Sequence, residues 1–123
     1  MKVRIYYEDT DAGGIVYHTK YINFCERARS EIFFNNNMIP DEGGKSGFVV
    51  KHIEADFIGS AQLGDLLEIK NRLLQRKRTS TTLLQEIYKN DQKLFSMRIL
   101  LVYIKNGKIS RIPEHFQSLF EQL

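Results

Sequence analysis

The sequence predicts an α+β fold in which an antiparallel five-stranded sheet wraps around one long central helix. One strand-like run precedes the only long stretch with helical periodicity, and four strand-like runs follow that stretch. Consecutive strands favour antiparallel pairing, and one face of such a sheet must be covered by the helix. The predicted order is therefore β-α-β-β-β-β.

The first predicted strand covers Val3–Tyr7, a short run rich in β-formers. A polar loop follows from Glu8 to Gly14, because acids, Thr10 and two glycines interrupt the pattern. The spacing predicts a helix over about 19–36, whose apolar stripe consists of Tyr21, Phe24, Cys25, Ala28 and Ile32. Three asparagines from Asn35 end it, since Asn tolerates the left-handed conformation found at helix ends.

The four later strands are predicted at residues 47–57, 65–76, 79–89 and 94–105. The last is the clearest, because apolar residues alternate strictly at Phe95, Met97, Ile99, Leu101 and Tyr103. Asn90-Asp91 predicts a tight turn before it. Pro113 opens a short amphipathic helix, which we expect to pack on the edge of the sheet.

Length and composition limit the class of protein. A chain of 123 residues with 42% hydrophobic and 27% charged residues suits one compact domain, residues 1–123. The single cysteine, Cys25, excludes an internal disulfide and a Cys-only zinc cluster, and its place on the apolar stripe favours core packing. No apolar run approaches the roughly 20 residues of a membrane span, and the first residues do not resemble a signal peptide. We therefore expect a soluble, cytoplasmic protein.

The net charge of +3 is unevenly distributed. Residues 1–60 carry 7 Lys/Arg and 9 Asp/Glu, whereas residues 61–123 carry 11 and 6. The basic half would favour a phosphorylated ligand or an acidic partner, although an ordinary solvated surface explains the same counts. Arg76-Lys77-Arg78 is too short a run, without a stacking platform, to indicate nucleic-acid binding.

The densest polar cluster runs from Tyr7 to His18. Its two glycines, Gly13 and Gly14, let the backbone approach a ligand closely, and the helix start exposes free N–H groups that stabilise negative charge on a carbonyl oxygen. Asp11 and His18 supply a base or nucleophile and an orienting group. These are the parts needed to hydrolyse an ester or thioester.

Structural explanations exist for the same residues. Acids and glycines before a helix often serve only as turn and cap, and a histidine beside an apolar helix is more often structural than catalytic. Asp9-x-Asp11 lacks the calcium-loop pattern, so we expect no metal, and the glycines match no nucleotide-binding fingerprint. His52 and His115 have no ligand-like spacing and are interpreted as structural or surface residues.

The run from Tyr7 to Tyr21, continued by Phe24-Cys25-Glu26-Arg27-Ala28-Arg29, closely resembles the start of hotdog-fold acyl-CoA thioesterases. The best match is the YbgC-like branch of the 4-hydroxybenzoyl-CoA thioesterase family. The predicted order of strands extends a weaker resemblance over almost the whole chain. Lys20 departs from this branch, which often carries Asn or another small polar residue there.

The resemblance implies a role for each residue of the segment. Asp11 matches the catalytic aspartate, either as nucleophile or as base for water, and the His18 backbone N–H would polarise the thioester carbonyl. The His18 side chain and Tyr7 match supporting catalytic positions. The residues expected to contact substrate are Gly13, Gly14, Val16 and Tyr17, whereas Glu26 and Arg29 are first assigned structural roles.

The resemblance also implies partners. The family forms dimers with two helices side by side under a continuous sheet, often pairing again into tetramers, with active sites at the subunit interface. Acyl-CoA is the expected substrate and no metal or bound cofactor is expected. Basic residues should meet the CoA phosphates, the candidates being Arg76, Lys77, Arg78 and Arg98. Two alternatives stay open: a thioesterase acting on acyl carrier protein, and a non-catalytic binding protein of the envelope or lipid machinery.

Overall fold

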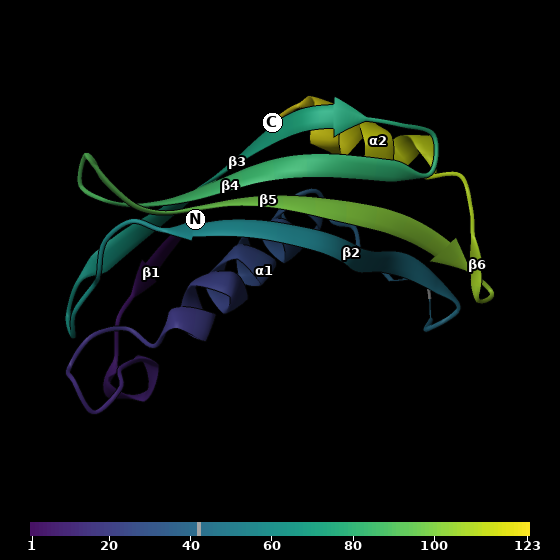
Figure 1. Ribbon diagram of the computed structural model, residues 1–123. Helices are drawn as coiled ribbons and strands as arrows, with labels where there is room; N and C mark the ends of the chain where they lie inside the picture. The colour runs from purple at the N-terminus through teal and green to yellow at the C-terminus, as the bar shows by residue number, and fades with distance from the viewer. Residues whose placement is uncertain (42) are drawn as a thin grey trace.

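A computed structural model of the chain describes residues 1–41 and 43–123. It confirms the predicted fold class, a curled antiparallel sheet around one long helix (Figure 1). The elements, in chain order, are β1 (Lys2–Arg4), a 3-10 helix (Tyr7–Asp9), α1 (His18–Phe34), β2 (Ser46–Phe57), β3 (Leu66–Arg76), β4 (Ser80–Lys89), β5 (Gln92–Lys105), β6 (Lys108–Ile109) and α2 (Glu114–Glu121).

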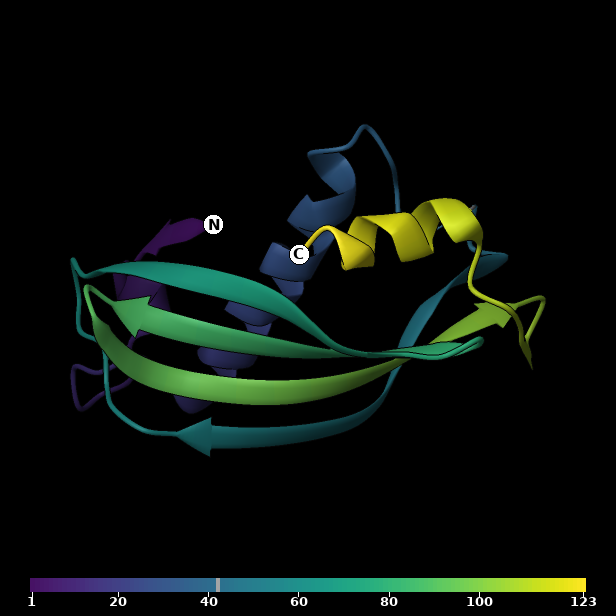
Figure 2. The same cartoon turned by 90° about the horizontal axis from the view of Figure 1, so that it is seen from above.

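The sheet has the strand order β1-β3-β4-β5-β2, with every neighbouring pair antiparallel, and β6 pairs with β5. The strands arch over α1, which crosses beneath their concave face (Figures 1 and 2). The crossover from α1 places β2 at one end of this order, next to β5 only. A 12-residue strand therefore forms one edge of the sheet.

Two elements differ from the prediction. The first strand ends at Arg4, because the Asp9 carboxylate accepts the Tyr6 N–H and the chain turns into the 3-10 helix that contains Tyr7. The sheet also has a sixth strand, β6, which the sequence analysis missed. Asn106 and Gly107 both have positive φ, at 51° and 78°, and form the tight turn that brings β6 back onto β5.

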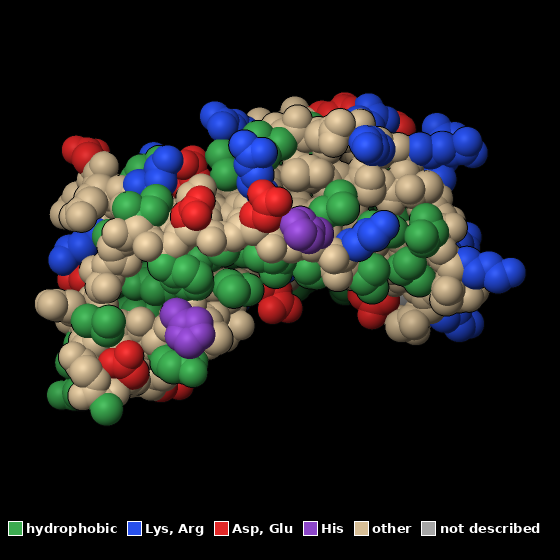
Figure 3. Space-filling model, in the orientation of Figure 1, with side chains coloured by type: hydrophobic (Ala, Val, Ile, Leu, Met, Phe, Trp, Pro, Cys, Tyr) green, Lys and Arg blue, Asp and Glu red, His purple; other side chains and the backbone are tan. Residues whose placement is uncertain are grey.

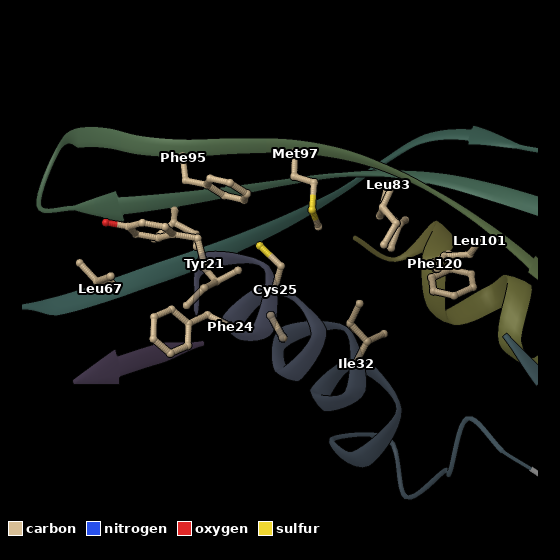
Figure 4. Packing of buried hydrophobic residues seen from close by; sticks show 14 of the residues in the cluster. Tyr21, Phe24, Cys25, Ile32, Leu67, Leu83, Phe95, Met97, Leu101 and Phe120 are labelled. Atoms are coloured by element: carbon tan, nitrogen blue, oxygen red, sulfur yellow. The ribbon is translucent and has the colours of Figure 1, made fainter. Parts of the chain in front are cut away.

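The predicted helix and its end are otherwise confirmed. The α1 stripe Tyr21, Phe24, Cys25, Ala28 and Ile32 is buried against the sheet, and Asn37 takes the left-handed conformation after the helix, with φ of 57°. In Figure 4 the Cys25 and Met97 side chains face one another between α1 and the sheet. The C-terminal helix α2 packs beside β3 and the end of α1, where Phe33 contacts Phe116 and Phe120. No helix in the described part of the chain is long and apolar enough to cross a membrane.

A polar network lies inside this core. Gln85 of β4 is fully buried; its Nε2 donates to the Cys25 carbonyl at 2.8 Å and to Asn71 Oδ1 at 2.7 Å. Its Oε1 accepts a hydrogen bond from Arg29 Nη1 at 2.9 Å. Burial lowers the pKa of the Arg29 guanidinium. The network thus ties the middle of α1 to β3 and β4 through side chains.

Candidate active site

Asp11 lies in a tight turn that leaves its side chain exposed. The Asp11 N–H donates to the Ile15 carbonyl at 2.9 Å, and the Asp11 carbonyl accepts the Gly14 N–H at 3.0 Å. The Gly13 N–H donates to Asp11 Oδ1 at 2.8 Å. Gly14 has φ of 82°, which favours glycine. The two glycines therefore build the turn and hold the carboxylate that it presents.

The turn is anchored to the segment between β2 and β3. The Val16 N–H donates to the Ala61 carbonyl at 2.9 Å, and Ile15 forms an isolated bridge with Gln62. The Val16 side chain is only 3% exposed and belongs to the core. Val16 thus anchors the turn to the core through its buried side chain and its backbone N–H.

The start of α1 lies at the other end of the same loop. Tyr17 precedes the helix and its N–H donates to the Asp9 carbonyl at 2.9 Å. His18 is the first helical residue, where an amide has no acceptor within the helix. Its exposed ring lies 4.6 Å from the Tyr17 ring and 6.0 Å from the Phe57 ring, measured between centroids. The loop therefore joins an accessible carboxylate to a free helix N-terminus.

Tyr7 stands just before this loop, in the 3-10 helix. Its side chain is 81% exposed, and its carbonyl accepts the Thr10 hydroxyl at 3.0 Å. The isolated bridge between Thr10 and Val16 and the bond from the Tyr17 N–H to the Asp9 carbonyl bring the segment of Tyr7 and Asp11 beside the start of α1.

Sequence reasoning missed the contribution of Asp9. This carboxylate is buried, accepts the Tyr6 N–H at Oδ2 over 2.9 Å, and pairs with Lys20, whose Nζ lies 3.5 Å from Oδ1. Lys20 lies in the first turn of α1, so the pairing depends on how the loop folds back onto the helix, which the sequence pattern does not show.

The basic cluster Arg76-Lys77-Arg78 lies around the β3–β4 turn, at the opposite end of the sheet from the loop that precedes α1 in the same chain (Figure 1). With Arg111 and Gln117 these residues line a pocket of about 500 Å³. Arg76 is paired with Glu114 and Glu121. Arg98 lies on β5, away from this pocket, where it is aligned with Glu54 and Leu84.

A larger groove of about 760 Å³ runs between α1 and the β2 edge. Glu26 and Arg29 enter it from α1, while Val49, Val50 and Ile53 enter it from β2. Figure 3 shows hydrophobic side chains gathered along this hollowed side of the molecule. A groove with this lining suits an apolar chain or an apolar protein surface.

The other candidate residues have ordinary environments. Cys25 is fully buried, which raises the pKa of its thiol to about 12. His52 is exposed beside Glu54, and His115 is exposed beside Phe116. Among the described residues, no three His, Cys, Asp or Glu side chains are grouped as metal ligands would be.

Comparison with known proteins decides the family. The model of the thioesterase-like superfamily matches residues 6–120. The chain belongs to the thioesterase-like superfamily. It is 48% identical to the acyl-CoA thioesterase YbgC of Helicobacter pylori strain J99, over 100% of this chain and 97% of that protein. It is 40% identical to the YbgC of strain 26695, over the full length of both.

A solved structure agrees with these relatives. The probable thioesterase from Bartonella henselae superposes with a TM-score of 0.85 at 33% identity, over 92% of this chain and 97% of that one. The comparisons confirm the resemblance to the YbgC-like branch, the hotdog fold and the predicted class of enzyme, a thioester hydrolase.

Proposed function

We propose that this thioesterase-like protein hydrolyses acyl-CoA to a carboxylic acid and free CoA, with Asp11 and the His18 amide as its reacting groups. The observation that carries the proposal is the loop itself, which joins a carboxylate fixed by Gly13 to the free amide at the start of α1. The names of the YbgC relatives support CoA as the carrier of the acyl group.

In this mechanism the thioester oxygen accepts the His18 N–H, which stabilises the negative charge that develops there. One such donor contributes roughly 3 kcal/mol in comparable sites. Asp11 then either attacks the carbonyl carbon, forming an anhydride that water hydrolyses, or removes a proton from the attacking water. In both routes the C–S bond breaks and a proton from water ends on the CoA thiolate. When Asp11 activates water, the new oxygen of the acid comes from that water; when Asp11 attacks directly, water adds to the Asp11 carbonyl of the anhydride, its oxygen stays in Asp11, and an original Asp11 oxygen leaves with the acid. Tyr7 and the His18 ring are assigned supporting roles at the exposed side of the site.

The decisive experiment is Asp11→Asn, assayed on short, long and aromatic acyl-CoAs. We expect loss of hydrolysis with an unchanged fold, because the amide can neither attack nor accept the proton of water. Asp91→Asn is the matched control, since Asp91 is also an exposed aspartate in a turn. Wild-type turnover in the Asp11 variant would refute the mechanism. Single-turnover hydrolysis in oxygen-18 water separates the two routes, because only direct attack leaves label in Asp11.

We also propose that two chains pair along β2. This 12-residue strand forms one edge of the sheet, Val49 and Val50 beside the groove are 46% and 47% exposed, and an uncovered apolar edge strand favours pairing with another chain. Pairing there would cover the groove with a second copy and place the acyl group between subunits. Val50→Lys should shift the protein to a monomer in sedimentation analysis; an unchanged oligomer would exclude this edge.

The basic pocket at the β3–β4 turn gives the second candidate substrate, acyl groups on acyl carrier protein. Arg78, Lys77 and Arg111 form the kind of cationic surface that an acidic carrier recognises. Matched CoA and carrier thioesters, compared at low and high salt, separate the substrates, because carrier docking weakens as salt screens the charges. Failure to hydrolyse either class would favour a non-catalytic binding protein.

A further inference from the structure

Lys20 and Asp9 form an ion pair beneath the candidate site. Lys20 Nζ lies 3.5 Å from Asp9 Oδ1, and the two side chains are 26% and 6% exposed. A carboxylate this well covered is expensive to leave without a counter-charge. The pair is therefore a more rigid connection than an ion pair in open solvent.

Asp9 accepts hydrogen bonds from residues at both ends of the loop, Tyr6 and Tyr17. Its Oδ2 accepts the Tyr6 N–H at 2.9 Å, which fixes the 3-10 helix leading to Asp11. Its backbone carbonyl accepts the Tyr17 N–H at 2.9 Å, which fixes the residue before His18. One residue thus holds both ends of the segment that contains Asp11 and leads to the His18 amide.

Lys20, in the first turn of α1, contacts both Asp9 and Tyr17. Its backbone N–H donates to the Tyr17 carbonyl at 2.9 Å, while its ammonium reaches Asp9. The backbone of Tyr17 is consequently held through its N–H by Asp9 and through its carbonyl by Lys20, and that carbonyl shares its peptide group with the His18 N–H. A shift of the ion pair would reorient that amide.

We propose that the Asp9–Lys20 pair positions the His18 amide and Asp11 for the attack on the thioester, without either residue touching the substrate. The inference rests on the proposed function. It gives a role to Lys20, the residue at which this chain departs from the YbgC-like pattern. Misplacement of reacting groups by about 1 Å lowers rates by up to roughly a hundredfold.

The test compares Lys20→Met, Asp9→Asn and Lys20→Arg in the full-length protein. Lys20→Met and Asp9→Asn should lower kcat roughly 10- to 100-fold with KM within about twofold of wild type. Lys20→Arg should retain most of the wild-type kcat, because a guanidinium also pairs with a carboxylate. Lys108→Met, which removes one exposed lysine from β6, is the control and should leave kcat and KM unchanged.

The pair predicts non-additive effects. The double variant of Lys20→Met with Asp9→Asn should be no slower than the slower single variant, since both break one contact. Circular dichroism identifies the variants that are folded. If Lys20→Met does not fold, the kinetics of Asp9→Asn test the proposal, because the Asn amide oxygen can still accept the Tyr6 N–H. Folded variants with wild-type kcat, or changed KM alone, would overturn the positioning role. If the wild-type protein does not hydrolyse acyl-CoA, the proposed function itself is refuted. If Asp11→Asn is inactive while Lys20→Met is fully active, only the positioning role of the Asp9–Lys20 pair is overturned.

Discussion

The Gly13 amide nitrogen lies 2.8 Å from Asp11 Oδ1, so the proposed catalytic carboxylate is held by the loop that carries it. The contact also leaves little room for a side chain at position 13. A Cβ built on Gly13 would lie 3.2 Å from the same oxygen, which is tighter than an ordinary contact. Gly13 therefore acts on the geometry of Asp11 through both its N–H and its lack of a side chain.

Gly13→Ala should lower kcat about tenfold while the protein stays folded, because the carboxylate must move by a few tenths of an ångström. Hydrolysis assays on acyl-CoA, with thermal unfolding as a check, measure the two effects. Gly107→Ala is the matched control: its φ of 78° makes alanine strained, but nothing lies within 4 Å of the added carbon. The control should lose roughly 1 kcal/mol of stability and no activity. If Gly13→Ala and Gly107→Ala have equal activity, Gly13 does not contribute to catalysis through the position of Asp11.

Arg78→Gln with Arg111→Gln should raise KM for acyl-CoA about tenfold and leave KM for acyl-pantetheine unchanged. Both cations line the pocket at the β3–β4 turn, at the opposite end of the sheet from the Asp11 loop of the same chain, so in the proposed dimer the phosphate they bind would belong to an acyl-CoA at the other subunit's site. That phosphate would form charge-assisted hydrogen bonds that the shorter substrate does not make. Arg72→Gln removes an exposed cation of β3 outside this pocket and controls for net charge. If KM rises equally for both substrates, the pocket does not bind the nucleotide end of CoA.

The parts of this site that follow a local pattern were predictable from the sequence. Periodicity located α1, and the helix start with Asp11 in the preceding loop followed from it. The role of Asp9 depends on contacts that a linear pattern does not reveal, since its partners Tyr6, Tyr17 and Lys20 meet only when the 3-10 helix folds against α1. β6 was missed for another reason: two residues are too few to show alternation, although Asn106-Gly107 carried the turn signal.

Cys25 should resist alkylation in the native protein, because burial raises the pKa of its thiol to about 12. An unfolded chain ionises this thiol near pH 8.5, so above that pH the unfolded state releases a proton that the native state keeps. The free energy of unfolding should consequently fall by up to about 1.4 kcal/mol per pH unit between pH 8.5 and 12 through this group. Denaturant titrations from pH 8 to 10.5 should show a shallower decline in Cys25→Ala. Identical slopes, or fast iodoacetamide labelling without denaturant, would contradict the assignment.

Gln85→Leu should destabilise the fold by roughly 2–4 kcal/mol, although leucine is apolar and similar in size. The substitution removes the acceptor of Arg29 Nη1 and the donor to the Cys25 carbonyl and Asn71 Oδ1, so several covered polar groups lose a partner together. Each such group costs about 1–3 kcal/mol, which outweighs the gain from burying leucine. Thr82→Val, at a half-buried position on the same strand, is the control for a polar-to-apolar change outside the Gln85 network. Combining Gln85→Leu with Arg29→Leu should recover part of the loss in urea titrations, because the uncompensated guanidinium is then absent. If the losses in free energy of unfolding of the two single variants add up in the double variant, the hydrogen bond between Gln85 and Arg29 contributes nothing to stability.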